Sequence, residues 1–211
     1  MVAQLVVAQL VVAQQIQFFT KKSNPAEFIR QLHFNMKDFT ITVYSENKTG
    51  LLSRIVSVFT RRHINIESLT TSKASIPGIH RFTIVVNLDE VNVKKVVAQI
   101  EKQVDVLKAF YYDESEIVHQ ELALYKVPTN AFKNGSSLEK IIRQHNARIL
   151  EIEPEYTVIE KTGHPEETEA LLRVLEKTGV YEFVRTGRVA IVKPMEMLNA
   201  YLKTIDFKYQ N

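Results

Sequence analysis

Cysteine and tryptophan are absent from this 211-residue sequence, and its charges nearly balance. The lack of cysteine excludes a disulfide framework, thiolate zinc sites and a cysteine nucleophile. It also fits a reducing compartment, so we expect a cytoplasmic protein. The formal net charge of +3 does not by itself indicate nucleic-acid binding. Because no window approaches the ~18 consecutive apolar residues of a membrane span, we expect neither a nucleic acid nor a membrane as a partner.

Motifs for catalysis are missing as well. The sequence has no Walker-type or G-x-G-x-x-G phosphate loop. Ser136-Ser137 is better explained as a helix cap than as a nucleophile, because no His-Asp partner is apparent. The histidines lack the i,i+4 or close-pair spacing of metal ligands; they are His33, His63, His80, His119, His145 and His164. We therefore predict no catalytic residue, no metal site and no cofactor in this chain.

Residues 1–35 differ from the rest of the sequence. Val-Ala-Gln recurs with a period of five from Val2, which matches neither a helix nor a strand. We interpret this segment as an atypical extension, either disordered or upstream of the true start, with the functional chain beginning at Met36. An organellar transit peptide is a second interpretation, because basic residues lie on both sides of the first acidic residue, Glu27.

From Met36 onward the hydrophobic pattern alternates between strand and helix periods. Phe39, Ile41 and Val43 alternate with polar residues, which predicts a half-buried strand. Asp89 is placed to cap a helix. The predicted elements are a strand from Phe39, a helix over 51–62, strands over 64–74 and 79–88, a helix after Asp89 and a strand over 104–112. This β-α-β-β-α-β order is typical of a ferredoxin-like unit.

The same order repeats after an acidic break at 113–116, which we interpret as a linker. The expected elements are a strand over 121–128, a helix opened by Ser136 with Glu139, a hairpin of 148–152 and 156–161, a helix from Pro165 that ends near Gly179, strands over 180–184 and 188–192, and a tail helix over 195–205. We predict an α+β chain of two consecutive ferredoxin-like βαββαβ domains, 36–113 and 119–205. Units this small are only marginally stable alone, so we expect the chain to associate with a partner.

The turn between the first strand and the first helix is the best candidate for ligand binding. Gly50 stands where the chain turns sharply, and glycine allows a positive φ and a close approach by a ligand. The helix-start amides of Thr49, Gly50, Leu51 and Leu52 are expected to be unpaired, which makes them a receptor for a carboxylate.

Two asparagines and three aliphatic residues complete this candidate. The amide carbonyls of Asn47 and Asn65 can accept hydrogen bonds from an ammonium group. Leu51, Leu52 and Ile66 can line an apolar pocket. A carboxylate, an ammonium and a small aliphatic side chain together describe a free aliphatic amino acid. The alternative is that these residues form only an ordinary turn and cap.

Residues 39–69 resemble the start of an ACT domain. More narrowly, Glu46-Asn47, Gly50–Arg54 and the run Asn65-Ile66-Glu67-Ser68-Leu69 resemble the regulatory (small) subunit of acetolactate synthase, also called acetohydroxyacid synthase. The resemblance covers about 36–205. His63 and Ile64 depart from the family pattern, as does the tract Lys73–Gly78.

The resemblance implies a regulatory protein. Two ACT domains would form a homodimer, with valine or another branched-chain amino acid between them. Gly50 and the following amides would hold its carboxylate, and Asn47 and Asn65 would make polar contacts. The thiamine diphosphate and magnesium would belong to a separate catalytic subunit, which this chain would activate and make sensitive to feedback inhibition.

Two alternatives use the same fold. An RNA-binding module with βαββαβ order needs exposed aromatic residues on its first and third strands, but the outward positions of the first strand are Thr40, Thr42 and Tyr44. The other alternative is an ACT-type amino-acid-binding regulator of another metabolic enzyme or of transcription. A regulator of transcription is the weaker of these two, because no helix-turn-helix pattern lies beside the predicted amino-acid-binding domain.

Overall fold

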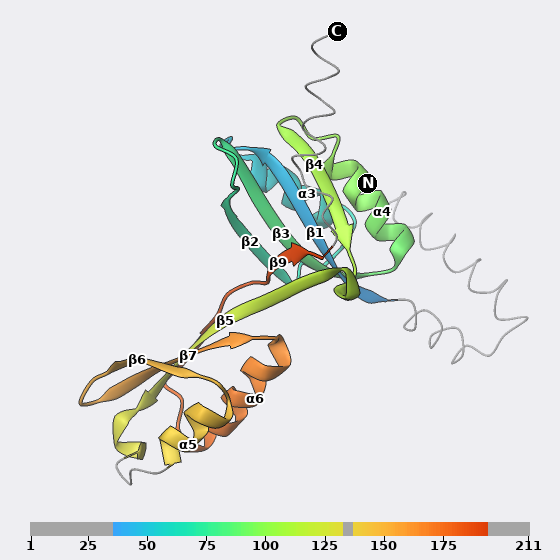
Figure 1. Cartoon of the computed structure of the whole chain (residues 1–211). Coiled ribbons are helices and arrows are strands. Elements are labelled where there is room, and N and C mark those ends of the chain that lie inside the picture. Colours follow the sequence, from blue (N-terminus) through green and yellow to red (C-terminus); the bar gives the residue numbers. More distant parts are fainter. Residues whose placement is uncertain (1–35, 133–136, 194–211) are drawn as a thin grey trace, which may run out of the picture.

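The structure is a computed structural model that describes residues 36–132 and 137–193. It contains two antiparallel sheets, each with two helices on one face (Figure 1). The atypical extension of 1–35, the tail helix expected over 195–205 and the cap at Ser136 lie outside the described residues. The prediction of an α+β chain with two βαββαβ-like units is confirmed.

The first unit has the predicted element order. It comprises β1 (Lys37–Glu46), α3 (Leu51–Thr60), β2 (Ser68–Lys73), β3 (Ile79–Leu88), α4 (Glu90–Ile100) and β4 (Val106–Tyr112). The strands lie in the order β2-β3-β1-β4, so β2 and β4 form the edges. β2 begins four residues later than predicted, because residues 64–67 form a loop in which Ile64 and Ile66 pack beside the core.

The core of this unit lies between the sheet and its helices. Phe39, Ile41 and Val43 are almost fully buried, as their alternation predicts. They meet the apolar stripes of α3 and α4, which are formed by Leu51, Ile55, Val58 and Phe59 and by Val93, Val96, Val97 and Ile100. Asp89 caps α4 as predicted, because its Oδ1 accepts a hydrogen bond from the Asn92 amide at 2.8 Å.

The second unit is built in the same way. It comprises β5 (Ile117–Pro128), α5 (Ser137–Gln144), β6 (Arg148–Ile152), β7 (Tyr156–Gly163), α6 (Pro165–Leu175) and β8 (Glu182–Arg185), with strand order β6-β7-β5-β8. Pro165 is at the start of α6, as predicted. The core centres on Tyr125, whose hydroxyl donates to the Thr168 carbonyl at 2.7 Å.

The two units are joined more closely than the sequence suggests. The acidic linker of 113–116 is a capped 3-10 turn, in which the Asp113 carboxylate accepts the Ser115 amide at 2.8 Å. β5 starts directly after this turn and runs from one sheet to the other (Figure 1).

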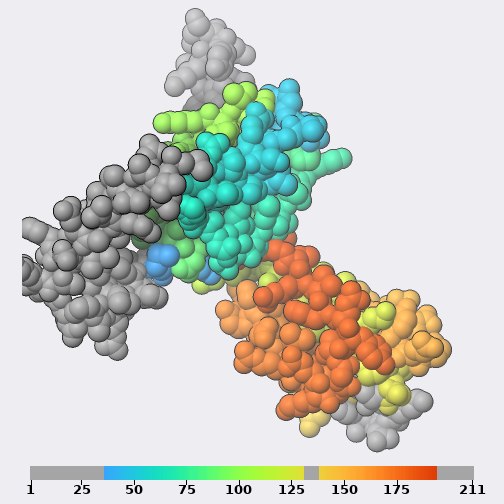
Figure 2. All heavy atoms as spheres, turned by 180° about the vertical axis from the view of Figure 1, so that it is seen from behind, coloured from blue at the N-terminus to red at the C-terminus, as the bar shows by residue number. Residues whose placement is uncertain are grey.

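The last strand, β9 (Val189–Val192), lies within the predicted strand of 188–192. It pairs with the first part of β5, from Ile117↔Val192 to Gln120↔Val189. β8 pairs with the later part of β5, so β8 and β9 lie end to end along that strand. Figure 2 shows two lobes, with the orange-red end of the described chain against the first.

Candidate functional site

Gly50 sits at the head of α3 in the conformation that the sequence predicts. Its φ of 81° and ψ of −6° are left-handed, a region that side chains other than glycine rarely adopt. A Cβ added here would meet nothing within 4 Å. Glycine is therefore required by the backbone conformation rather than by crowding, and the space above the turn is open.

The amides around Gly50 are mostly free. Within the part of the chain that the structure describes, the amides of Thr49, Gly50 and Leu52 donate no hydrogen bond. The prediction is wrong for Leu51, whose amide donates to the Lys48 carbonyl at 3.4 Å. The first turn of α3 contains no acidic residue, so the positive end of the helix dipole faces solvent without a carboxylate of its own.

Two other loops hold this turn in place. The amide of Asn47 donates to the Gly78 carbonyl at 3.3 Å, and the amide of Glu46 donates to the Asp105 carbonyl at 3.0 Å. Arg54, in the first turn of α3, pairs with the Asp105 carboxylate at 2.7 Å. Asp105 has a φ of 72° and was missed by sequence analysis, because only its ability to adopt left-handed backbone could have indicated its role.

The aliphatic residues of the site divide into two kinds. Leu51 is 1% exposed and points into the core of its own unit, so the prediction that it lines an apolar pocket is wrong. Leu52 is 40% exposed beside the turn. Ile66 is half-buried and packs against the core from the loop before β2. Leu52 and Ile66 thus remain as candidates for contact with an aliphatic ligand.

Asn65 lies in the loop between α3 and β2. Its side chain is exposed, and its Nδ2 donates to Glu67 Oε1 at 2.8 Å. This bond occupies the amide nitrogen and leaves the amide oxygen as an acceptor. The Glu67 amide donates to the Val85 carbonyl at 2.9 Å, which ties the loop to β3.

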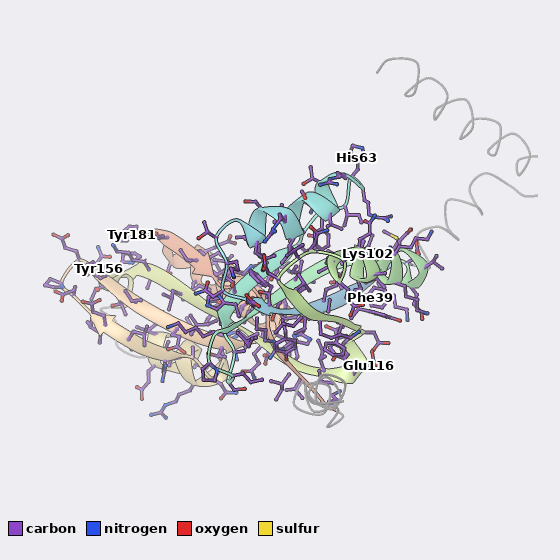
Figure 3. All side chains as sticks on the ribbon, turned by 90° about the horizontal axis from the view of Figure 1, so that it is seen from above. Phe39, His63, Lys102, Glu116, Tyr156 and Tyr181 are labelled. Carbon is purple, nitrogen blue, oxygen red and sulfur yellow. The ribbon has the colours of Figure 1, made fainter. Side chains whose placement is uncertain are left out.

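The two halves of the predicted site are not brought together within one copy of the chain. The Gly50 turn precedes α3 and Asn65 follows it, so the ten residues of the helix, at about 1.5 Å each, place them roughly 15 Å apart. Figure 3 labels His63 beyond the end of α3, in the loop that leads to Asn65. A small amino acid cannot bridge that separation.

Both units match families of known proteins. Residues 41–108 match the family model described as the AHAS small subunit-like ACT domain, and residues 120–194 match the one described as the small subunit of acetolactate synthase. The acetolactate synthase small subunit of Mycolicibacterium smegmatis is 36% identical over 72% of this chain and 89% of its own length. That of Bacillus subtilis is 35% identical over 78% and 96%.

A solved structure agrees with these matches. The acetolactate synthase small subunit from Thermotoga maritima superposes with a TM-score of 0.69 at 28% identity, covering 75% of this chain and 98% of that one. The chain belongs to the acetolactate synthase small subunit family. It is thus a regulatory subunit, and its first unit is an ACT domain.

The second unit of this small subunit contributes a buried histidine that sequence analysis did not single out. His119 is 3% exposed, its Nε2 lies 3.0 Å from Glu114 Oε1, and its ring packs edge-on against His164. Burial, and then the nearby Arg188, lower the pKa of His119. Across 36–132 and 137–193, no group of three acidic or histidine side chains is arranged to hold a metal ion. None of the helices in these ranges has the length and hydropathy needed to cross a bilayer.

Proposed function

We propose that this small subunit activates a separate, thiamine-diphosphate-dependent acetolactate synthase catalytic subunit and makes it sensitive to a branched-chain amino acid, with valine as the first candidate. The observation that carries the proposal is the Gly50 turn. It combines a left-handed glycine with three free amides at an open helix start, in a chain whose family is that of a regulatory subunit.

The effector is proposed to lie between two copies of the chain. β2 is an edge strand, and it runs parallel to β1 because both are antiparallel to β3. The Gly50 turn follows the end of β1, whereas the Asn65 loop precedes the start of β2. If two β2 edges pair antiparallel, the turn of one copy is brought toward the Asn65 loop of the other. A homodimer through the ACT domains therefore unites the two half-sites.

Each group of a zwitterionic amino acid has a proposed partner in this arrangement. The amides of Thr49, Gly50 and Leu52 take the carboxylate, at roughly 1.5–3 kcal/mol for each charged hydrogen bond. The amide oxygens of Asn47 and Asn65 take the ammonium group. Leu52 of one copy and Ile66 of the other contact the aliphatic side chain, which selects for branched-chain amino acids.

The catalytic chemistry is assigned to the partner. We infer that thiamine diphosphate and magnesium bind the catalytic subunit and that this chain carries neither cofactor nor catalytic residues. Its contribution is to raise the partner's activity and to transmit the effector signal.

Reconstitution tests this proposal against an ACT regulator of another enzyme. The full chain is mixed with the catalytic subunit encoded by the same organism, and acetolactate formation from pyruvate is measured without effector. The proposal expects the two chains to co-purify and the activity to exceed that of the catalytic subunit alone. Absence of both association and activation would favour the other enzyme or a transcriptional target.

A further inference from the structure

Residues 186–190, which lead from β8 into the start of β9, closely approach the face of the ACT sheet that lies away from its helices; we call them the crossover segment. A Cβ added to Gly187 would lie 2.5 Å from Thr70 Oγ1 and 2.6 Å from Ser68 Oγ. Such distances are too short for any side chain. Unlike Gly50, Gly187 is required by contact, because its approach to β2 leaves no room for a methyl group.

Arg188 continues this contact with hydrogen bonds. Its backbone amide donates to Ser68 Oγ at 3.0 Å, and its guanidinium Nη1 donates to Thr40 Oγ1 at 3.1 Å. The guanidinium also lies 3.6 Å from a Glu114 carboxylate oxygen. Although Arg188 is charged, it is only 8% exposed. A buried arginine with partners on three elements fixes one orientation of the crossover segment on the sheet.

The junction also contains polar groups that docking leaves unpaired. Thr70 Oγ1, which lies against Gly187, and Arg81 Nε are buried without a hydrogen-bond partner among the described residues. Arg81 nevertheless donates through Nη2 to the Ala190 carbonyl at 2.5 Å. Unpaired buried polar groups oppose docking, so they weaken the hold of the crossover segment on the sheet.

β2, the strand that the crossover segment contacts, directly follows the loop that carries half of the proposed effector site. Ser68 follows Asn65 by three residues, and the bond from the Glu67 amide to the Val85 carbonyl lies between them. A polar cavity of about 720 Å³ is lined by Glu67 and Ser68 from the ACT domain and by Arg185 and Arg188 from the second unit. Any displacement of the Asn65 loop is therefore applied at the first residue of the crossover contact.

We propose that the contact of Ser68 and Thr70 with Gly187 and Arg188 couples effector binding to the placement of the second unit. This inference rests on the proposed function, since it supposes that a branched-chain amino acid binds beside Asn65. Gly187 and Arg188 are positioning residues, because neither touches the proposed ligand. An effector that orders the Asn65 loop shifts the start of β2. The contact of Gly187 with Ser68 and Thr70 passes that shift to β8 and β9, which both pair with β5. Two packed arrangements of such a contact suffice for switching.

The test uses the full chain reconstituted with its catalytic subunit. Gly187→Ala places a methyl group against Thr70 and Ser68, and Ser68→Ala removes only the acceptor of the Arg188 amide. The triple variant Gly187→Ala/Ser68→Ala/Thr70→Ala removes the two oxygens that the new methyl group meets. Ser72→Ala, on the same strand but exposed and outside the contact, is the matched control. Valine binding is measured by calorimetry, and activation and inhibition by acetolactate formation.

The expected result separates binding from response. Gly187→Ala should bind valine and activate the catalytic subunit like the parent, while saturating valine inhibits much less than in the parent, because binding is no longer coupled to the second unit. The triple variant should regain part of the response, and Ser72→Ala should behave like the parent. If Gly187→Ala fails to fold, a weaker inhibition of Ser68→Ala by valine supports the coupling inference.

Two results would overturn the inference, and they are distinguishable. If both Gly187→Ala and Ser68→Ala bind valine and are inhibited like the parent, the coupling route is wrong and the effector site stands. If the parent itself binds none of valine, leucine and isoleucine in calorimetry, the proposed effector site is wrong and the coupling inference fails with it.

Discussion

At the scale of single residues, Gly50 and Gly187 are each required to be glycine, but for different physical reasons. Gly50 is needed because its φ is 81°, and nothing lies near its missing side chain. Gly187 is needed because the Ser68 and Thr70 oxygens occupy the space of a methyl group. The need for Gly50 could be predicted from the sequence, since a sharp strand-to-helix turn often requires a left-handed backbone conformation. The need for Gly187 could not, because the contact joins positions more than 100 residues apart.

Replacing Gly50 with Asp is predicted to abolish feedback while largely keeping activation. The carboxylate would stand where the ligand's carboxylate is proposed to bind, and the left-handed backbone would add about 1–2 kcal/mol of strain. Gly50→Ala is the matched control, because it carries the strain without the charge. Inhibition curves on the reconstituted complex should show a much larger loss for Asp than for Ala. Equal effects in the two variants would mean that strain, and not charge at this turn, is responsible.

Asn65→Ala is predicted to weaken effector binding with little structural damage, because the side chain is exposed and bonds only to Glu67. Loss of one hydrogen bond to a charged group corresponds to roughly 10- to 100-fold in affinity. Calorimetry of the full chain with valine measures this directly. Parent-like affinity would remove Asn65 from the site.

At the scale of elements, the alternation and the helix caps were enough to predict most strands and helices. Phe39, Ile41 and Val43 predicted β1, and Asp89 predicted the start of α4. The sequence assigned no partner to β9, because a short strand such as Val189–Val192 fits the edge of either sheet equally well. The β2 boundary was missed, since the apolar residues Ile64 and Ile66 pack against the core from a loop and imitate the start of a strand.

The edge strand β2 supports a prediction about dimerisation. Thr71 lies near the middle of β2 and is exposed, so a two-fold pairing of β2 edges places it close to its own copy. Thr71→Asp should therefore weaken the dimer by about 0.2–1 kcal/mol through like-charge repulsion, and more at low salt. Thr71→Asn, equal in shape but neutral, is the control. Sedimentation of the full chain that finds a strict monomer, or no difference between the two variants, would count against the β2 interface.

At the scale of the whole molecule, the junction between the two units buries a titratable side chain. The His119 ring is buried there between Glu114 and His164, with Arg188 nearby. Sequence analysis predicted the two units and their family, and it located the Gly50 turn. It could not predict this junction, because periodicity reports which residues are buried within an element but not which elements meet.

The lowered pKa of His119 gives the junction a pH dependence. The folded state favours the neutral ring, whereas the unfolded chain protonates it near pH 6.5. The unfolded state thus binds more protons, and the free energy of unfolding should fall as the pH drops below about 6.5. His119→Gln, which cannot be protonated, should show a flatter dependence between pH 7 and pH 5. Denaturant melts across that range measure it, and identical slopes for parent and variant would contradict the prediction.

The central proposal for this chain is that it senses a branched-chain amino acid on behalf of a catalytic partner. The most direct measurement is a valine titration of acetolactate formation by the catalytic subunit, with and without this chain. We predict that the chain alone makes no acetolactate, that adding it raises the partner's rate, and that valine lowers the rate only when the chain is present. A rate that valine affects equally with and without this chain, or that none of the three branched-chain amino acids affects, would contradict the account.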